Sequence, residues 1–204
     1  MLGIAWVVLF VAALYLDVPV ARWVVNHRPL NKNSPLVMVV KSPGTYYVTM
    51  GIALLLFLCH PLKGRAAVLP LIAGALGGAG YSLMKWFVGR HRPDKGVKGF
   101  DFHLFVGGLR GLFTEKALSF PSGHTCLAFA TAASLAILIP RWRAAWFIIA
   151  TAVAAERVLE NAHYLSDVVA GAGLGIICAN ITWHYVRACG VAGGAEAVGV
   201  GKGL

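Results

Sequence analysis

The sequence predicts an all-α integral membrane protein, a single-domain bundle of about six transmembrane helices. Hydrophobic residues make up 58% of the 204 residues and charged residues only 13%, whereas a soluble domain carries about 25% charged residues. Six apolar segments are separated by polar stretches, and a spanning helix needs roughly 20 residues. The chain therefore accommodates six helices but no second globular domain.

The predicted helices follow apolar segments at about 2–20, 44–60, 66–84, 125–140, 144–159 and 167–187. No Lys or Arg precedes the first segment and Asp17 follows its apolar run, so we interpret it as a retained helix and not as a signal peptide. The fourth and fifth segments are short for a full span, and we expect their ends to reach polar or protein-lined surroundings. We predict a membrane domain at 1–189 and a disordered, Gly- and Ala-rich tail at 190–204.

Glycines are concentrated in two predicted helices, at 74–80 and at Gly171, Gly173 and Gly175. In a membrane, small residues let helix backbones approach closely, so we interpret these glycines as helix contacts. A glycine-rich phosphate loop would need a strand-to-helix context, which this sequence does not offer.

The formal net charge of +10 comes from basic residues that lie between the apolar segments. A nucleic-acid-binding protein would gather them on one soluble face, so we expect no nucleic-acid partner. Seven of the 18 Lys and Arg residues fall between Lys85 and Lys116. This concentration predicts a negatively charged substrate.

The first polar cluster is formed by Lys85 and Arg92, at the end of the third apolar segment. A separation of seven residues would place both side chains on one helical face, two turns apart, before Pro93 breaks the helix. Two cations so placed can converge on one anion. The alternative is a pair of basic side chains that extend along apolar surface to the membrane edge.

The second cluster lies at 120–125, where the fourth apolar segment begins. The unpaired N–H groups and the dipole of a helix N-terminus favour an anion there. Ser122 adds a hydroxyl, Gly123 permits close backbone approach, and His124 can donate a proton near neutral pH. The alternative is an ordinary helix cap.

The third cluster, Arg157, His163 and Asp167, lies between the fifth and sixth segments. His163 and Asp167 share a face if the sixth helix begins nearby. A carboxylate at this position fixes the tautomer of the imidazole and leaves its other nitrogen free to attack phosphorus. The alternative is a structural histidine with a helix-capping aspartate.

Ionisable groups near membrane segments cost several kcal/mol unless they are paired, so three such clusters at segment ends indicate a function. If six helices alternate in direction, the loops that carry Lys85 to Ser122 and Arg157 to His163 emerge on the same side. We therefore expect the three clusters to form one active site at one membrane face.

The three clusters together, Lys85-x6-Arg92-Pro93, Pro121-Ser122-Gly123-His124 and Arg157-x5-His163-x3-Asp167, resemble the three-part signature of the type 2 phosphatidic acid phosphatase and vanadium haloperoxidase superfamily. The match covers residues 85–167, and the six-segment layout is similar to that of its membrane lipid phosphatase branch. The resemblance implies that His163 attacks the phosphate to form a phosphohistidine, that Asp167 orients it, and that His124 protonates the leaving oxygen. The residues implied to bind the phosphoryl oxygens are Lys85, Arg92, Ser122, Gly123 and Arg157.

The resemblance implies a lipid phosphate monoester or diphosphate as substrate, with surrounding membrane lipids as the other partners. Undecaprenyl diphosphate, lipid A, phosphatidylglycerol phosphate and phosphatidic acid are substrates that such families accept. We expect no cofactor and no metal, because no set of Asp, Glu, His and Cys has the ligand spacing of Mg²⁺ or Zn²⁺. The sequence does not indicate an oligomeric state.

The distribution of basic residues and the family resemblance indicate opposite membrane orientations. The predicted active-site side carries twelve Lys and Arg and the other side six, which by the positive-inside rule would make it cytoplasmic. Lys85, Arg92 and Arg157 have a chemical reason to lie there, and without them the count is nine against six. The resemblance implies a bacterial inner-membrane protein whose active site faces the periplasm or cell exterior, and we adopt that orientation.

Glu156 is the departure from the family pattern, which usually has Ser immediately before the arginine of the third motif. Two interpretations are open. An ionised Glu156 that faces the pocket would repel phosphate, so Glu156→Ser would strengthen substrate binding. A Glu156 that pairs with Arg157 or Lys85 would reposition the phosphate clamp, and in the Arg157 case the same substitution would misplace the guanidinium and lower activity.

Two other classes of protein compete with the membrane phosphatase. A soluble haloperoxidase-like enzyme would hold vanadate in the same anion pocket, but six apolar segments argue against solubility. A non-enzymatic protein that binds or transports lipid phosphates would use the basic cluster for a head group. Such a protein has no need of His124 and His163 as an acid and a nucleophile.

Overall fold

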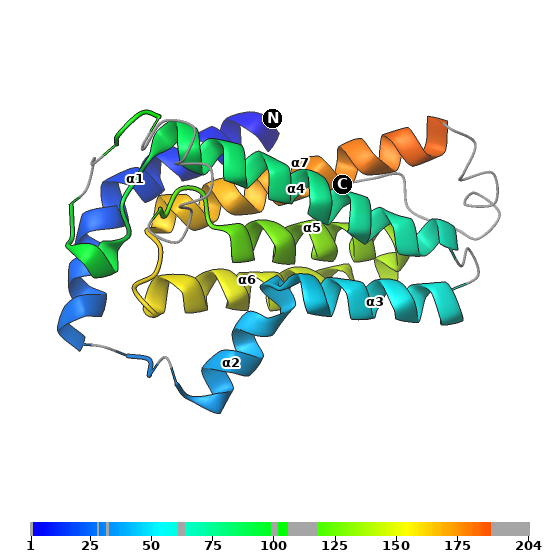
Figure 1. Ribbon diagram of the computed structural model, residues 1–204, viewed down its shortest axis with the longest axis horizontal. Helices are drawn as coiled ribbons and strands as arrows, with labels where there is room; N and C mark the ends of the chain where they lie inside the picture. The colour runs from blue at the N-terminus through cyan, green and yellow to red at the C-terminus, as the bar shows by residue number, and fades with distance from the viewer. Residues whose placement is uncertain are drawn as a thin grey trace.

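The computed structural model describes residues 2–27, 29–31, 33–60, 64–98, 102–105 and 118–188, which form a helical bundle (Figure 1). Its helices are α1 Leu2–His27, α2 Pro35–Lys41, α3 Tyr46–Cys59, α4 Gly64–Val88, α5 Gly123–Leu138, α6 Arg143–Leu159 and α7 Leu165–Ala188. Within these ranges the structure has no strand, apart from an isolated bridge between His91 and Leu118. The predicted all-α class is therefore confirmed, while the predicted tail at 190–204 lies outside the described residues.

Each of the six predicted helices is present, but the N-terminal part of the bundle differs from the prediction. The first helix continues to His27, and the short helix α2 was not predicted. α2 begins with Pro35, whose fixed φ suits the first helical position. The turn Ser42–Gly44, called η1, then separates α2 from α3, because Pro43 has no N–H with which to continue a helix.

Three of the described helices, α1, α4 and α7, are long and apolar enough to cross a membrane. A fourth span is possible if the pair Pro35–Gly44 and Tyr46–Cys59, bent by 62°, counts as one. By length and composition these helices do not reproduce the predicted count of six spans. The shorter helix α5 is surrounded by protein, and every residue from Thr125 to Leu138 is buried, so its length need not match the thickness of the apolar membrane layer.

Helix α5 runs through the middle of the bundle, between α4, α6 and α7 (Figure 1). Glycines allow its neighbours to come close, as predicted. A Cβ on Gly171 of α7 would lie 2.6 Å from the Ser122 carbonyl oxygen, and one on Gly175 would collide with the carbonyl oxygen of Cys126. The N-terminus of α5 and the first turns of α7 are thereby held against each other.

A third close contact brings the bent N-terminal segment to the same end of α5. A Cβ on Gly44 of η1 would lie 2.6 Å from the carbonyl oxygen of His124. The backbone of η1 therefore packs directly on the first turn of α5, where no side chain has room.

We expect Gly175→Ala to lower the free energy of unfolding by about 1–3 kcal/mol, because the added methyl group overpacks the contact between α5 and α7. Gly51→Ala is the matched control: Gly51 is exposed on α3 and nothing lies within 4 Å of the added Cβ. Alanine should there gain up to about 1 kcal/mol of helix propensity. Thermal unfolding of both purified variants in detergent, followed by circular dichroism, checks this order, and equal midpoints would contradict it.

Candidate functional site

A cavity of about 420 Å³, called the polar cavity because basic side chains and histidines line it, opens beside the N-terminus of α5. Five of the predicted site residues line it: Lys85, Arg92, Gly123, His124 and His163. Aromatic rings complete the lining, contributed by Tyr46, Tyr47 and Tyr81. The structure thus brings residues from all three sequence clusters to one cavity, whereas Ser122, Arg157 and Asp167 lie outside its lining.

Lys85 and Arg92 reach this cavity by a different route from the one predicted. Helix α4 ends at Val88, and Gly89 has a φ of 61°, which is the left-handed conformation typical of a glycine after a helix. Its N–H donates to the carbonyl oxygen of Lys85 at 2.8 Å. The prediction of one helical face is therefore wrong, because Arg92 lies beyond the helix and not on it.

Arg92 is held by a short backbone pairing instead. Its Nε donates to the carbonyl oxygen of Leu118 at 3.3 Å. The N–H of Ser119 donates to the carbonyl oxygen of Arg90 at 2.7 Å, and the Ser119 hydroxyl lies 3.1 Å from the carbonyl oxygen of His91. The segment 90–92 is therefore fastened to 118–119, next to the start of α5.

Ser122 is the N-cap of α5, which is the alternative that its sequence context left open. Its Oγ accepts hydrogen bonds from the backbone N–H of Thr125 at 3.5 Å and from the Thr125 hydroxyl at 3.0 Å. The backbone N–H of Ser122 donates to the carbonyl oxygen of Asp167 at 3.0 Å. The cap leaves Gly123 and His124 in the first turn of α5, beside the cavity.

His163 is buried before the start of α7, and its Nδ1 lies 2.8 Å from the carbonyl oxygen of Ser119. A carbonyl only accepts hydrogen bonds, so Nδ1 carries the proton and Nε2 of the neutral ring carries a lone pair. Asp167 Oδ2 is 3.7 Å from Nδ1, too far for a hydrogen bond. Asp167 is thus near His163, as expected, while the direct hydrogen bond goes to a backbone carbonyl that sequence reasoning did not single out.

The pKa of His163 lies below its ordinary value, because burial disfavours the charged ring. Asp167 opposes this shift, whereas Arg92 and Lys85 add to it. At neutral pH the ring is therefore an uncharged base, which is the form a nucleophile requires.

Asp167 has a second basic partner that sequence reasoning missed. Arg90 is 1% exposed and donates from Nη1 to Asp167 Oδ1 at 2.8 Å and from Nη2 to Asp17 Oδ2 at 2.8 Å. Its guanidinium also lies over the ring of Tyr164, 3.9 Å from the ring centre. The available signal was the presence of Asp17 in an apolar helix, because a carboxylate there needs a buried cation.

Arg157 is held by two carboxylates. Its Nε donates to Glu156 Oε2 at 2.6 Å and its Nη2 to Glu156 Oε1 at 2.7 Å, and Nη2 also pairs with Glu160. Of the two interpretations of Glu156, the structure therefore has the pairing with Arg157. The guanidinium is therefore already paired with two carboxylates.

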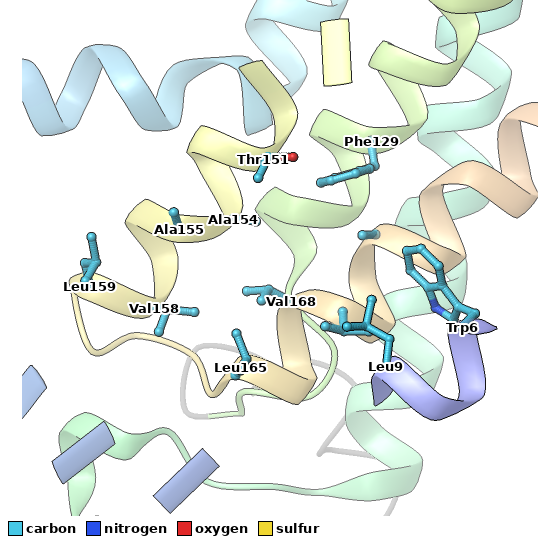
Figure 2. A pocket seen from close by; sticks show the side chains of 12 residues that line it. Trp6, Leu9, Phe129, Thr151, Ala154, Ala155, Val158, Leu159, Leu165 and Val168 are labelled. Carbon is cyan, nitrogen blue, oxygen red and sulfur yellow. The ribbon is translucent and has the colours of Figure 1, made fainter. Parts of the chain in front are cut away.

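A second cavity of about 430 Å³ lies between α1, α5, α6 and α7. Figure 2 shows Trp6 and Leu9 of α1 on one side of it and Val158 and Leu159 of α6 on the other. No titratable side chain lines this cavity. It therefore offers apolar contact and no titratable group, in contrast to the polar cavity.

No group of three His, Cys, Asp or Glu side chains among the described residues is placed to hold a metal ion. The charges that line the polar cavity come from Lys85 and Arg92, with the two histidines beside them. Such a cavity suits an anion.

The fold and the cavity together define a helical membrane protein in which two basic side chains and two histidines line one cavity. The chain belongs to the PAP2 superfamily, whose family model matches residues 66–190. The family indicated by the three sequence motifs is thereby confirmed. Asp17 and the helix α1 lie outside the matched span.

Among curated proteins, the lipid A 1-phosphatase of Rhizobium johnstonii is 37% identical over 117 residues, covering 54% of this chain and 43% of that protein. The chain thus matches less than half of the relative's length. Among solved structures, Aquifex aeolicus LpxE has a TM-score of 0.60 at 24% identity, covering 83% of this chain and 96% of that chain.

A transmembrane PAP2 type phosphatidylglycerolphosphate phosphatase from Bacillus subtilis has a TM-score of 0.62 at 16% identity, covering 91% of this chain and 96% of the other. At these identities the two solved structures show the fold. The three long apolar helices of this bundle agree with that fold.

Because Glu156 pairs with Arg157, we expect Glu156→Ser to lower kcat/KM about tenfold, as the guanidinium loses two buried hydrogen bonds to a charged partner. Glu156→Gln keeps one acceptor oxygen and should lose less. Glu160→Gln, which removes the other carboxylate from Arg157, is the matched control for charge alone. Steady-state kinetics across pH checks these values. A gain in substrate affinity for Glu156→Ser that shrinks at acidic pH would show instead that Glu156 repels the substrate.

Proposed function

We propose that this protein is a membrane phosphatase that hydrolyses a lipid phosphate monoester or diphosphate through a phosphohistidine intermediate. The observation that carries the proposal is the polar cavity, in which Lys85 and Arg92 accompany His124 and His163. The Nδ1 proton of His163 is committed to the Ser119 carbonyl oxygen, so Nε2 is the nitrogen available for attack.

In the first step of the proposed reaction, Nε2 of His163 forms a bond to phosphorus as the bond to the leaving oxygen breaks. His124 donates a proton to that oxygen, which departs as the alcohol or the lower phosphate. Water then attacks the phosphohistidine, His124 accepts its proton, and inorganic phosphate is released. Lys85 and Arg92 stabilise the charge that develops on the phosphoryl oxygens, helped by the N-terminus of α5 at Gly123.

Ser122, Arg157 and Asp167 have supporting roles in this proposal. Ser122 caps the helix that presents His124, and Asp167 lies behind His163. Arg157, whose guanidinium Glu156 and Glu160 hold in place, binds a phosphoryl oxygen in that orientation. Glu156 therefore modulates the clamp.

The proposed substrate class follows from the relatives and from the membrane setting of the site. The name of the Rhizobium johnstonii relative makes lipid A the first candidate, and the Bacillus subtilis structure adds phosphatidylglycerol phosphate. Phosphatidic acid and undecaprenyl diphosphate complete the set to be tested. We place the protein in a bacterial inner membrane with this cavity facing the periplasm or cell exterior.

One observation favours a second function, which is non-enzymatic binding or transport of a lipid phosphate. Arg157, a residue of the third motif, is already neutralised by Glu156 and Glu160. A binding protein would retain affinity for these lipids but release no phosphate from any of the four. Measuring both quantities with the purified protein separates the two functions.

We expect His163→Gln to abolish phosphate release while the protein still inserts and folds, because the apolar helices do not depend on this ring. Label from a ³²P-labelled substrate should be trapped on the wild type in an acid-labile, base-stable form and be absent from the variant. His184→Gln, an exposed position on α7, is the matched control and should keep both properties. Turnover by His163→Gln at the wild-type rate would rule out the nucleophile.

We expect orthovanadate to inhibit phosphate release, because a trigonal-bipyramidal anion can occupy the cationic cavity beside His163. A chelator should not inhibit, since in the proposed reaction the two histidines and the basic side chains do the chemistry. The measurement is phosphate release with vanadate or EDTA present. Complete inhibition by EDTA, reversed by Mg²⁺, would require a different mechanism.

A further inference from the structure

A buried ion cluster joins the first helix of the bundle to the residues behind His163. The guanidinium of Arg90 lies between Asp17 of α1 and Asp167 of α7, and 2.8 Å separates it from each carboxylate. All three side chains are at most 1% exposed. Charges this deep are retained only when they are paired, since each would otherwise cost several kcal/mol.

The hydrogen bonds of the cluster converge on its carboxylates. Arg90 Nη1 donates to Ser166 Oγ and to Asp167 Oδ1, both at 2.8 Å, which uses both of its hydrogens. The Ser166 hydroxyl in turn donates to Asp17 Oδ2 at 2.5 Å.

Asp17 therefore only accepts hydrogen bonds. Besides the Ser166 hydroxyl, the backbone N–H of Ser166 donates to Asp17 Oδ1 and Arg90 Nη2 donates to Asp17 Oδ2, both at 2.8 Å. Asp167 likewise accepts from the backbone N–H of Tyr164 at 2.8 Å. Both carboxylates are ionised in this arrangement.

Among the described residues, two carboxylates and one guanidinium give this cluster one net negative charge. If Arg90 had Asp167 as its sole anionic partner, the pair would be neutral and would do little for a positive charge on His163. The carboxylate of Asp17 offsets the guanidinium. The negative charge of Asp167, 3.7 Å from Nδ1 of His163, can then stabilise a positive charge on that ring.

We propose that Asp17 is a positioning residue for the phosphohistidine reaction: through Arg90 it holds Asp167 beside His163 and maintains the net negative charge that the phosphorylated imidazolium requires. This inference rests on the proposed function. When Nε2 bonds to phosphorus and the bond to the leaving oxygen breaks, Nδ1 keeps its proton and the ring becomes cationic. His124 supplies the proton to the leaving oxygen, so the positive charge remains next to Asp167.

Other charged groups face His163, and they make the contribution of Asp17 measurable. Lys85 on α4 and Arg92 after it disfavour the cationic ring, and His124 on α5 interacts with it. Arg157 on α6 is balanced by its own carboxylates, Glu156 and Glu160. Asp167 on α7 favours the cation, and Asp17 keeps that carboxylate effective.

The test is Asp17→Asn, which removes the charge and keeps the size of the side chain. We expect the pKa of His163 to fall by on the order of one unit, because the substitution removes a unit negative charge that is linked to the ring through Arg90 and Asp167. Titration of ¹⁵N-histidine-labelled protein in detergent by NMR measures it, with the signal assigned by its loss in His163→Gln.

Kinetics gives the second readout, with whichever of phosphatidic acid and lipid A the wild type turns over. The acidic limb of the kcat/KM profile should move to lower pH by the same amount, because the ring stays neutral further into acid. We expect kcat to fall about tenfold with KM changed less than twofold, since Asp17 does not line the cavity.

Two further variants separate charge from structure. Thr131→Val removes the buried hydrogen bond between Thr49 and Thr131 but no charge, so it should lower the unfolding temperature without moving the pKa of His163. Asp17→Glu keeps the charge and should return the acidic limb of the kcat/KM profile to its wild-type pH. If Asp17→Asn is not monodisperse, Asp17→Ser carries the same test.

The results distinguish the two proposals. A His163 pKa that does not move in a folded, neutral Asp17 variant would overturn the role of Asp17, whether or not the wild type is active. Absence of phosphate release by the wild type from all four lipids would instead overturn the proposed function, and the NMR titration would still report the charge effect.

Discussion

The approach of α7 to α5 is the contact on which the site depends. Gly171 and Gly175 remove the side chains that would keep these backbones apart, and the N–H of Ser122 donates to the carbonyl oxygen of Asp167 across the contact. Because α5 starts where α7 makes its first turn, the histidine of one helix N-terminus and the histidine preceding the other line one cavity. The geometry of the candidate site therefore follows from helix packing.

Buried charge is the second constraint, and the molecule satisfies it by distributing each cation over several acceptors. Arg90 is shared by Asp17 and Asp167, and Arg157 by Glu156 and Glu160. Neither guanidinium lines the polar cavity. The two cations that do, Lys85 and Arg92, leave it positive for a phosphate, so structural and substrate-facing charges are kept apart.

Hydropathy and motif spacing predict much of this arrangement, because helix positions depend on long apolar runs and the site residues occur in a distinctive order. These two signals fail where the interacting group leaves no local pattern in the sequence. The Ser119 carbonyl that orients His163 is a backbone atom, and the partner Asp17 of Arg90 is 73 residues away. Gly89 ends α4 before Arg92, a local effect that seven-residue spacing alone conceals. The short helix α2 escapes prediction for a similar reason, since its seven residues carry little hydrophobic periodicity.

The contact between Gly44 and the backbone of His124 also bears on how this cavity can diversify. A wall made of two backbones in contact accepts no new side chain, so mutation at position 44 cannot adapt the cavity to a different head group. The rings of Tyr46, Tyr47 and Tyr81 border the same space and can be exchanged without disturbing that contact. Changes in the shape of the cavity are therefore open to these aromatic positions and closed to position 44.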